Sequence, residues 1–107
     1  MKLLTKEVLK RLPALHAQEN AADPIAYAKF FTPDAGWTWY ATEGEPQDGD
    51  FVFFGWVMGI EPEWGTFLMS ELTSVRGKLG LPVERDRFFT PQPISEVMKR
   101  HGIPPRR

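Results

Sequence analysis

Gly36-Trp37-Thr38-Trp39-Tyr40-Ala41-Thr42 is the stretch that decides the fold of this chain. Tryptophan and alanine at its odd-numbered positions alternate with threonine and tyrosine at its even-numbered ones, which is the two-residue period of a β-strand. If Trp37 and Trp39 face the core, Tyr40 is displayed on the other face between two threonines. An exposed tyrosine of this kind is typical of an interface anchor. The alternative is that all three aromatic residues pack inside.

The residues that follow predict an antiparallel meander. Residues 43–50 combine two glycines, a proline and four acids, which favours a hairpin connection. Residues 51–60 are apolar on both faces, as expected of the central strand of a covered sheet, and their two glycines mark a bulge or a close backbone approach. Glu61-Pro62-Glu63 is a turn, and residues 64–69 read as a third strand.

The flanking segments predict helices and extended chain around this meander. Thr5 can cap a helix over residues 5–12, and Ser70 can cap a short helix that ends at Gly77. The remaining expected elements are extended chain at 25–31 and at 81–89 and a terminal helix at 94–101, with 103–107 as a frayed tail. The prediction is therefore an α+β fold: a small antiparallel sheet of three or more strands flanked by an N-terminal, a middle and a C-terminal helix. Residues 1–107 are expected to form one compact domain.

Composition places the protein among ordinary soluble domains. It has 107 residues, of which 42% are hydrophobic and 25% charged, and it contains no cysteine. The absence of cysteine excludes disulfides and thiolate chemistry, and a cytoplasmic location is the expectation. No segment is apolar for long enough to predict a membrane span or a signal peptide, so we expect no membrane association.

Charge is sorted along the chain, although the formal net charge is only −1. Residues 34–71 carry eight acidic side chains and no Lys or Arg, and they include all four tryptophans. Residues 1–33 and 72–107 are both net basic. The simplest interpretation places the acids in solvated turns, and the functional alternative is an acidic, aromatic face that binds a partner.

The functional alternative defines a set of candidate residues for binding a partner protein. They are aromatic or acidic, and they come from the predicted meander: Trp39, Tyr40, Asp48, Asp50, Glu61, Glu63 and Trp64. Imitation of DNA by such an acidic surface would be confined to one face, because both ends of the chain are basic.

A second set of candidates lies in the irregular segment 76–87, where acidic and basic residues alternate around two glycines and a proline. Its basic members can bind phosphate or an acidic partner: Arg76, Lys78, Arg85 and Arg87. Together with the basic first helix they suggest an alternative function, a nucleic-acid-binding accessory factor. The structural alternative is an ion-pair network, in which Arg76 and Arg85 pair with Glu71, Glu84 or Asp86.

No motif for catalysis or metal binding stands out. The two histidines, His16 and His101, lie far apart in the sequence, and no serine sits in a nucleophile elbow. We therefore assign no catalytic residue, no metal ligand and no cofactor. A small metal-assisted enzyme is the third functional hypothesis.

Several motifs across nearly the whole chain resemble one family. They include Lys29-Phe30-Phe31-Thr32-Pro33, the strand from Trp37 to Glu43, Phe53-Phe54-Gly55, and Arg76-Gly77 followed by Leu79-Gly80-Leu81-Pro82. The chain is similar to a family of short bacterial proteins classed as a domain of unknown function. The resemblance implies a location on plasmids, integrative conjugative elements or prophages, near anti-restriction or conjugation genes, and it implies no activity.

Together these observations favour a non-enzymatic interaction protein of a mobile genetic element. It would bind a host or element-encoded protein, in defence evasion for example. A homodimer remains open at this point.

Overall fold

The fold is described from a computed structural model, which describes residues 2–103. Residues 2–103 form three short helices, one sheet of five strands and one of two. In chain order the elements are α1 (Lys6–Arg11), β1 (Ile25–Ala26), β2 (Ala28–Phe31), β3 (Thr38–Gln47), β4 (Asp50–Met58), β5 (Pro62–Leu68), α2 (Met69–Ser74), β6 (Glu84–Arg85), β7 (Gln92–Pro93) and α3 (Ile94–Arg100). The predicted α+β class is confirmed.

The larger sheet is antiparallel throughout, with the strand order β5-β4-β3-β2-β6. The predicted antiparallel sheet of three or more strands is confirmed, and β2 and β6 extend the meander of β3, β4 and β5. Apolar residues of β4 are buried on both faces of the sheet, as the sequence predicts. The middle position nevertheless belongs to β3, so the expectation that residues 51–60 form the central strand is wrong.

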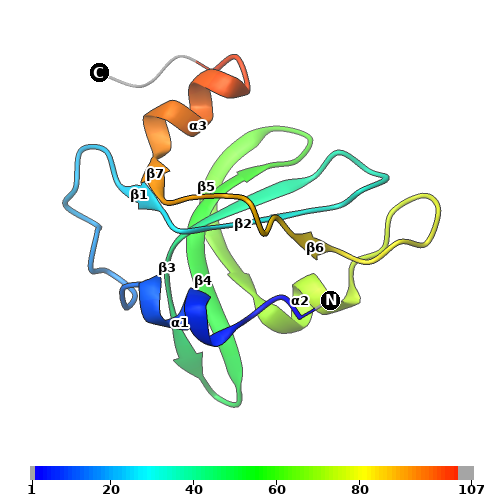
Figure 1. Ribbon diagram of the computed structural model, residues 1–107, viewed down its shortest axis with the longest axis horizontal. Helices are drawn as coiled ribbons and strands as arrows, with labels where there is room; N and C mark the ends of the chain where they lie inside the picture. Colours follow the sequence, from blue (N-terminus) through cyan, green and yellow to red (C-terminus); the bar gives the residue numbers. More distant parts are fainter. Residues whose placement is uncertain (1, 104–107) are drawn as a thin grey trace.

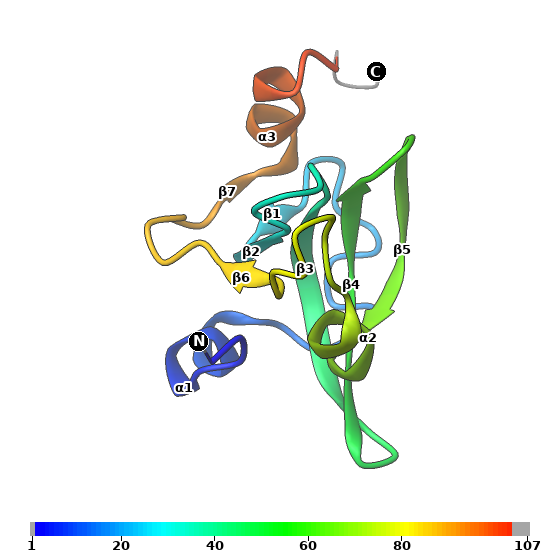
Figure 2. The same ribbon diagram turned by 90° about the vertical axis from the view of Figure 1, so that its right-hand side faces the viewer.

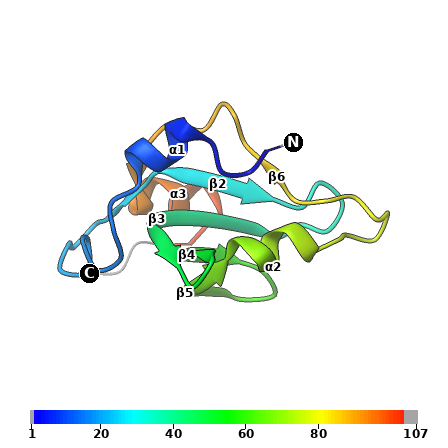
Figure 3. The ribbon, with the colours of Figure 1, turned by 90° about the horizontal axis from the view of Figure 1, so that it is seen from below.

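Each face of the sheet carries its own core. On one face, α1 and α2 cover Phe30, Phe53 and Phe67 (Figure 3). On the other face, α3 packs its Ile94 and Val97 over Tyr40 and Trp56. Figures 1 and 2 both show α3 at the opposite end of the molecule from the tip of the β3–β4 hairpin.

Gly55 of β4 marks a close backbone approach, as predicted. A Cβ atom on Gly55 would lie 1.8 Å from the carbonyl oxygen of Tyr40, so only glycine fits there. The register of β3 against β4 shifts between Ala41 and Glu43, directly beside this contact.

The predicted hairpin connection at residues 43–50 is wrong in extent. β3 continues to Gln47 and β4 begins at Asp50, so only Asp48 and Gly49 form the turn. Both have a positive φ, of 51° and 79°, as a two-residue hairpin turn requires. The acids at 43 and 45 therefore lie within a strand.

Other boundaries differ in smaller ways. The extended segment 25–31 is divided at Tyr27 between two sheets, and only Glu84–Arg85 of the segment 81–89 pairs as a strand in the larger sheet. The middle helix begins at Met69, so Ser70 is not its cap, and it ends at Ser74 rather than Gly77.

At the two ends of the described chain, one prediction is confirmed and one is wrong in its starting residue. Thr5 caps α1 by accepting the N–H of Val8, as predicted. Ile103 packs against the α3 core, so the predicted frayed tail does not begin there. The rest of that tail, residues 104–107, lies outside the described residues.

Candidate functional site

The acids of the middle segment are mostly held by backbone N–H groups. Glu43 is 3% exposed, and its two carboxylate oxygens accept the N–H groups of His16 and Gln18, each at 2.8 Å. Glu45 accepts the N–H of Leu15 at 2.9 Å. These bonds fix residues 15–18 to β3 beyond Ala41, the last residue of β3 that pairs with β2. Neither glutamate lies in a solvated turn, so that interpretation is wrong for them.

Three more acids hold other segments. Asp34 accepts the N–H of Leu79 at 2.6 Å and thereby holds the loop after α2. Glu71 accepts the N–H of Leu68 at 2.7 Å. Asp50 accepts the hydroxyl of Ser70 at 2.5 Å and the N–H of Phe51, and these hydrogen bonds, that of Ser70 first, lower the pKa of Asp50. Asp50 is thus a structural contact of α2.

The other three acids of the segment do not form one surface. Asp48 lies in the β3–β4 turn, whereas Glu61 and Glu63 lie at the other end of β4. The length of β4 separates these ends by about 25 Å at the usual rise of a strand. Among residues 2–103, the acidic segment therefore offers no continuous array of unanchored carboxylates.

Two aromatic candidates are buried. Trp39 belongs to the core under α1, and Tyr40 is 4% exposed beneath α3. Of the two interpretations of this strand, display of Tyr40 on the outside is wrong, because α3 covers that face of the sheet. The alternative, packing inside, is right for Trp39 and Tyr40. The hydroxyl of Tyr40 lies 2.7 Å from Nε2 of His101, and burial raises the pKa of Tyr40 to about 12. Trp37, expected to face the core with Trp39, is the partly exposed member of the group.

Trp64, by contrast, lies in a large groove, which we call the Trp64 groove. It has a volume of about 770 Å³ and is walled by residues 18–24, by the sheet face that α3 also covers, and by α3 itself. Its lining residues are Gln18, Glu19, Ala21, Ala22, Asp23, Pro24, Thr42, Glu43, Phe54, Trp56, Pro62, Trp64, Ile94, Ser95, Met98 and Ile103. The volume falls in the range of about 300–1,000 Å³ that is usual for ligand sites.

The floor of the Trp64 groove is aromatic and its walls are acidic. The rings of Trp64 and Phe54 stack with centroids 5.8 Å apart, yet Trp64 remains 40% exposed. The lining includes three carboxylates: Glu19 is exposed, Asp23 accepts the N–H and the hydroxyl of Ser95, and Glu43 is the buried residue described above. None of the described residues that line the groove is Lys or Arg. Trp64 is a residue that the sequence singles out, whereas the wall residues Glu19 and Asp23 are not, because nothing in the sequence shows that residues 18–24 lie at the groove.

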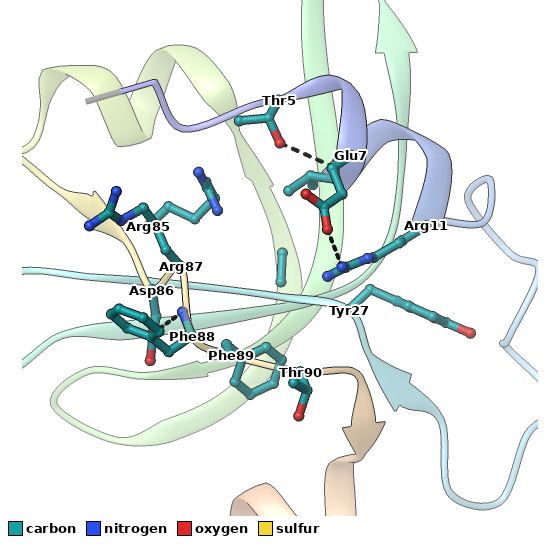
Figure 4. A pocket seen from close by; sticks show the side chains of 12 residues that line it. Thr5, Glu7, Arg11, Tyr27, Arg85, Asp86, Arg87, Phe88, Phe89 and Thr90 are labelled. Carbon is teal, nitrogen blue, oxygen red and sulfur yellow. Dashed lines mark hydrogen bonds and ion pairs between the residues drawn. The ribbon is translucent and has the colours of Figure 1, made fainter.

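The second cavity, which we call the Arg85 pocket, lies between α1 and the segment after β6 (Figure 4). Its volume is about 250 Å³, and it brings Arg11 of α1 together with Arg85 and Arg87. The other lining residues are Thr5, Glu7, Val8, Tyr27, Ala28, Asp86, Phe88, Phe89 and Thr90. The sequence suggested that the first helix and the segment 76–87 act together in binding nucleic acid. Both segments contribute residues to this pocket.

The remaining two basic candidates lie elsewhere. Nη1 of Arg76 donates to the carbonyl oxygens of Thr73 and Val75, each at 2.8 Å, so Arg76 binds the end of α2 rather than an acidic side chain. Lys78 lies in the following loop, which Arg76 and Pro82 close by a β-bridge. Neither residue lines the Arg85 pocket.

Two general features bear on the functional hypotheses. Within residues 2–103, no group of three or more His, Cys, Asp or Glu is placed to hold a metal ion. In the same part of the chain, no helix is long and apolar enough to cross a membrane.

The fold and its cavities define a small α+β domain with an acidic aromatic groove and a separate basic pocket. Residues 3–101 match the model of the family described as protein of unknown function (DUF2958), and the chain belongs to this family. The comparisons with curated proteins and with solved structures found no match. Family membership therefore leaves the function to be argued from the two cavities.

Proposed function

We propose that this protein is a non-enzymatic interaction protein, which takes an extended, basic segment of a partner protein into the Trp64 groove. The observation that carries the proposal is the exposed indole of Trp64 in a groove whose described lining has acids and no basic side chain. Exposed aromatic residues in a pocket are frequent anchors of protein interfaces. Carboxylates around them favour a partner segment with Lys or Arg beside an apolar residue.

The edge of the sheet supports an extended conformation of the bound segment. β5 is the last strand of the larger sheet, and among the described residues no strand pairs with its outer side. Pro62 and Trp64 of β5 line the groove, so the groove extends to this edge strand. Addition of a strand to such an edge is a common mode of peptide recognition.

The resemblance to proteins of plasmids, conjugative elements and prophages suggests where the partner comes from. We propose a host or element-encoded cytoplasmic protein, with defence evasion as one role. The groove requires only a short segment of the partner, so the proposal does not depend on the partner's fold.

Selection from a random peptide library tests the proposal. The chain is immobilised, peptides are selected with counter-selection against Trp64→Ala, and affinities are measured by fluorescence anisotropy. We expect peptides that carry Lys or Arg beside an aromatic or aliphatic residue, with a loss of about tenfold or more in Trp64→Ala. Phe88→Ala is the matched control, because Phe88 is 86% exposed outside the groove, and it should bind like the wild type.

Other results would contradict the proposal. Failure to enrich any peptide, enrichment of acidic peptides, or equal losses in Trp64→Ala and Phe88→Ala would each overturn it. Glu19→Gln keeps the test valid if Trp64→Ala is poorly folded, since Glu19 is an exposed wall residue and its loss should weaken basic peptides. Self-association that Trp64→Ala abolishes would show that a second copy of the chain is the occupant.

A further inference from the structure

We propose that the Arg85 pocket binds a phosphate group. No residue lines both this pocket and the Trp64 groove, so the inference is independent of the proposed function. In Figure 4, Glu7 and Arg11 approach from α1, and Arg85 and Arg87 approach from the opposite wall. Three arginines from two distant parts of the sequence thus line one small cavity.

The acids of the pocket are already engaged. Glu7 pairs with Arg11 within α1. Asp86 lies 3.5 Å from Nζ of Lys29, and it also accepts the N–H of Phe88 at 2.9 Å. Among the lining residues, three arginines stand against two carboxylates, so the lining carries a net positive charge. Such a surplus attracts an anion.

The shape of the donors favours phosphate. A guanidinium presents its N–H groups as a planar fork that fits the oxygens of a phosphate in pairs. Thr5 of the α1 wall also lines the pocket. The volume of 250 Å³ accommodates a phosphate group and lies below the usual range of about 300–1,000 Å³ for larger ligands.

The fold holds the two walls in place. β6 pairs with β2, and this pairing sets Arg85 opposite Phe30, a fully buried core residue. The N–H of Asp86 donates to the carbonyl oxygen of Lys29 at 2.9 Å, which extends the pairing by one residue. On the other wall, Val8 anchors α1 in the core. A pocket with fixed walls loses little entropy when an anion binds.

Calorimetric titration with inorganic pyrophosphate at low salt tests the inference. The test variant is the double substitution Arg11→Gln and Arg87→Gln, and the matched control is Arg76→Gln and Lys78→Gln. All four residues are exposed, and both variants lose two positive charges. We expect binding by the wild type and the control, and binding at least tenfold weaker in the pocket variant. Arg85→Lys, which keeps the charge but loses the fork, should weaken binding as well.

Two sources of phosphate are distinguished by a second arm with a fluorescent single-stranded oligonucleotide. Binding of pyrophosphate but not of the oligonucleotide identifies a small phosphorylated ligand. Oligonucleotide binding whose salt dependence falls in the pocket variant but not in the control identifies a nucleic-acid backbone. Either result supports the phosphate site. Absence of binding to both probes, or equal losses in the pocket and control variants, would overturn it.

Discussion

The Trp64 groove and the Arg85 pocket differ in almost every property, although one small sheet supports both. The groove is about three times larger, and its floor consists of stacked aromatic rings with carboxylates at the walls. The pocket is small and polar, with three arginines. The groove suits a chain segment with apolar and basic side chains, whereas the pocket suits a compact anion.

The basic and acidic segments of the sequence contribute to the two cavities in different ways. The basic first helix and the residues after β6 converge because β6 pairs with β2 on the side of the sheet that α1 covers. The acidic segment behaves differently, since most of its carboxylates bind backbone N–H groups. Two of the three acids of the groove, Glu19 and Asp23, come instead from the net basic first third of the chain. The summed charge of a segment therefore does not locate a charged surface.

The largest expected effect is a loss of stability when a buried residue that supports the groove is substituted. Trp56 is almost fully buried behind the groove and contacts Tyr40 and His101. Trp56→Ala should lower the free energy of unfolding by about 3–5 kcal/mol, because it leaves a large cavity in the α3 core. Urea unfolding measures the change, and both cavities should lose their ligands as the chain unfolds.

Trp64→Ala is the control for this prediction. Its indole is part of the same cross-strand pair with Trp56 but remains partly exposed, so its loss should cost only about 1 kcal/mol. Pyrophosphate binding should then persist while peptide binding is lost. Equal destabilisation by the two substitutions would show that the floor of the groove is part of the core.

A smaller effect is expected where residues 15–18 are fixed to β3. Glu43→Gln keeps the size of the side chain, but an amide can accept only one of the two N–H groups that Glu43 accepts. The unpaired N–H should cost about 1–3 kcal/mol of unfolding free energy. The wall of the groove at residues 18–24 should loosen, and the Arg85 pocket should be unaffected.

Glu45→Gln is the matched control, because Glu45 accepts a single N–H through one oxygen and an amide can replace that bond. Its unfolding free energy in urea should stay close to that of the wild type. A loss as large as that of Glu43→Gln would mean that charge, and not the number of accepted bonds, stabilises this segment.

Periodicity and turn chemistry predicted the class of the fold and most of its elements. The alternation at 36–42 and the apolar run at 51–60 identify adjacent strands because side-chain period and burial are local properties. The hairpin between β3 and β4 was predicted, but its strands were predicted too short, because glycine, proline and acids at 43–47 favour a loop and only tertiary bonds overcome that preference. The Asp48-Gly49 pair is the local signal that could have located the turn.

The cavities could be predicted only in part. Trp64, Arg85 and Arg87 were identified by residue type, because exposed aromatics and arginines are common in binding sites. Arg11 has no signal beyond its place in a basic helix, and no motif in residues 18–24 marks them as the wall of a groove. Their positions follow from contacts between distant segments, such as Gln18 with Thr42 at 2.8 Å, which no local pattern encodes.

The smallest predicted effect is a dependence on pH in the α3 core, next to the groove. Burial lowers the pKa of His101, and the positive charges of Lys29 and Arg100 lower it further. The unfolded chain therefore binds a proton at His101 more readily than the folded chain does. Stability should be constant above the ordinary histidine pKa of about 6.5 and should fall as the pH decreases below it.

Urea unfolding between pH 5 and 8 measures this dependence. His101→Gln should reduce the slope below pH 6.5, because glutamine cannot take up a proton beside Tyr40. His16→Gln removes the other histidine of the chain and tests whether the slope belongs to His101. In the wild type, peptide binding should weaken at acid pH, because α3 forms one wall of the groove and its core is then less stable. If His101→Gln keeps the full slope, the carboxylates cause it, and the core beneath α3 does not sense pH.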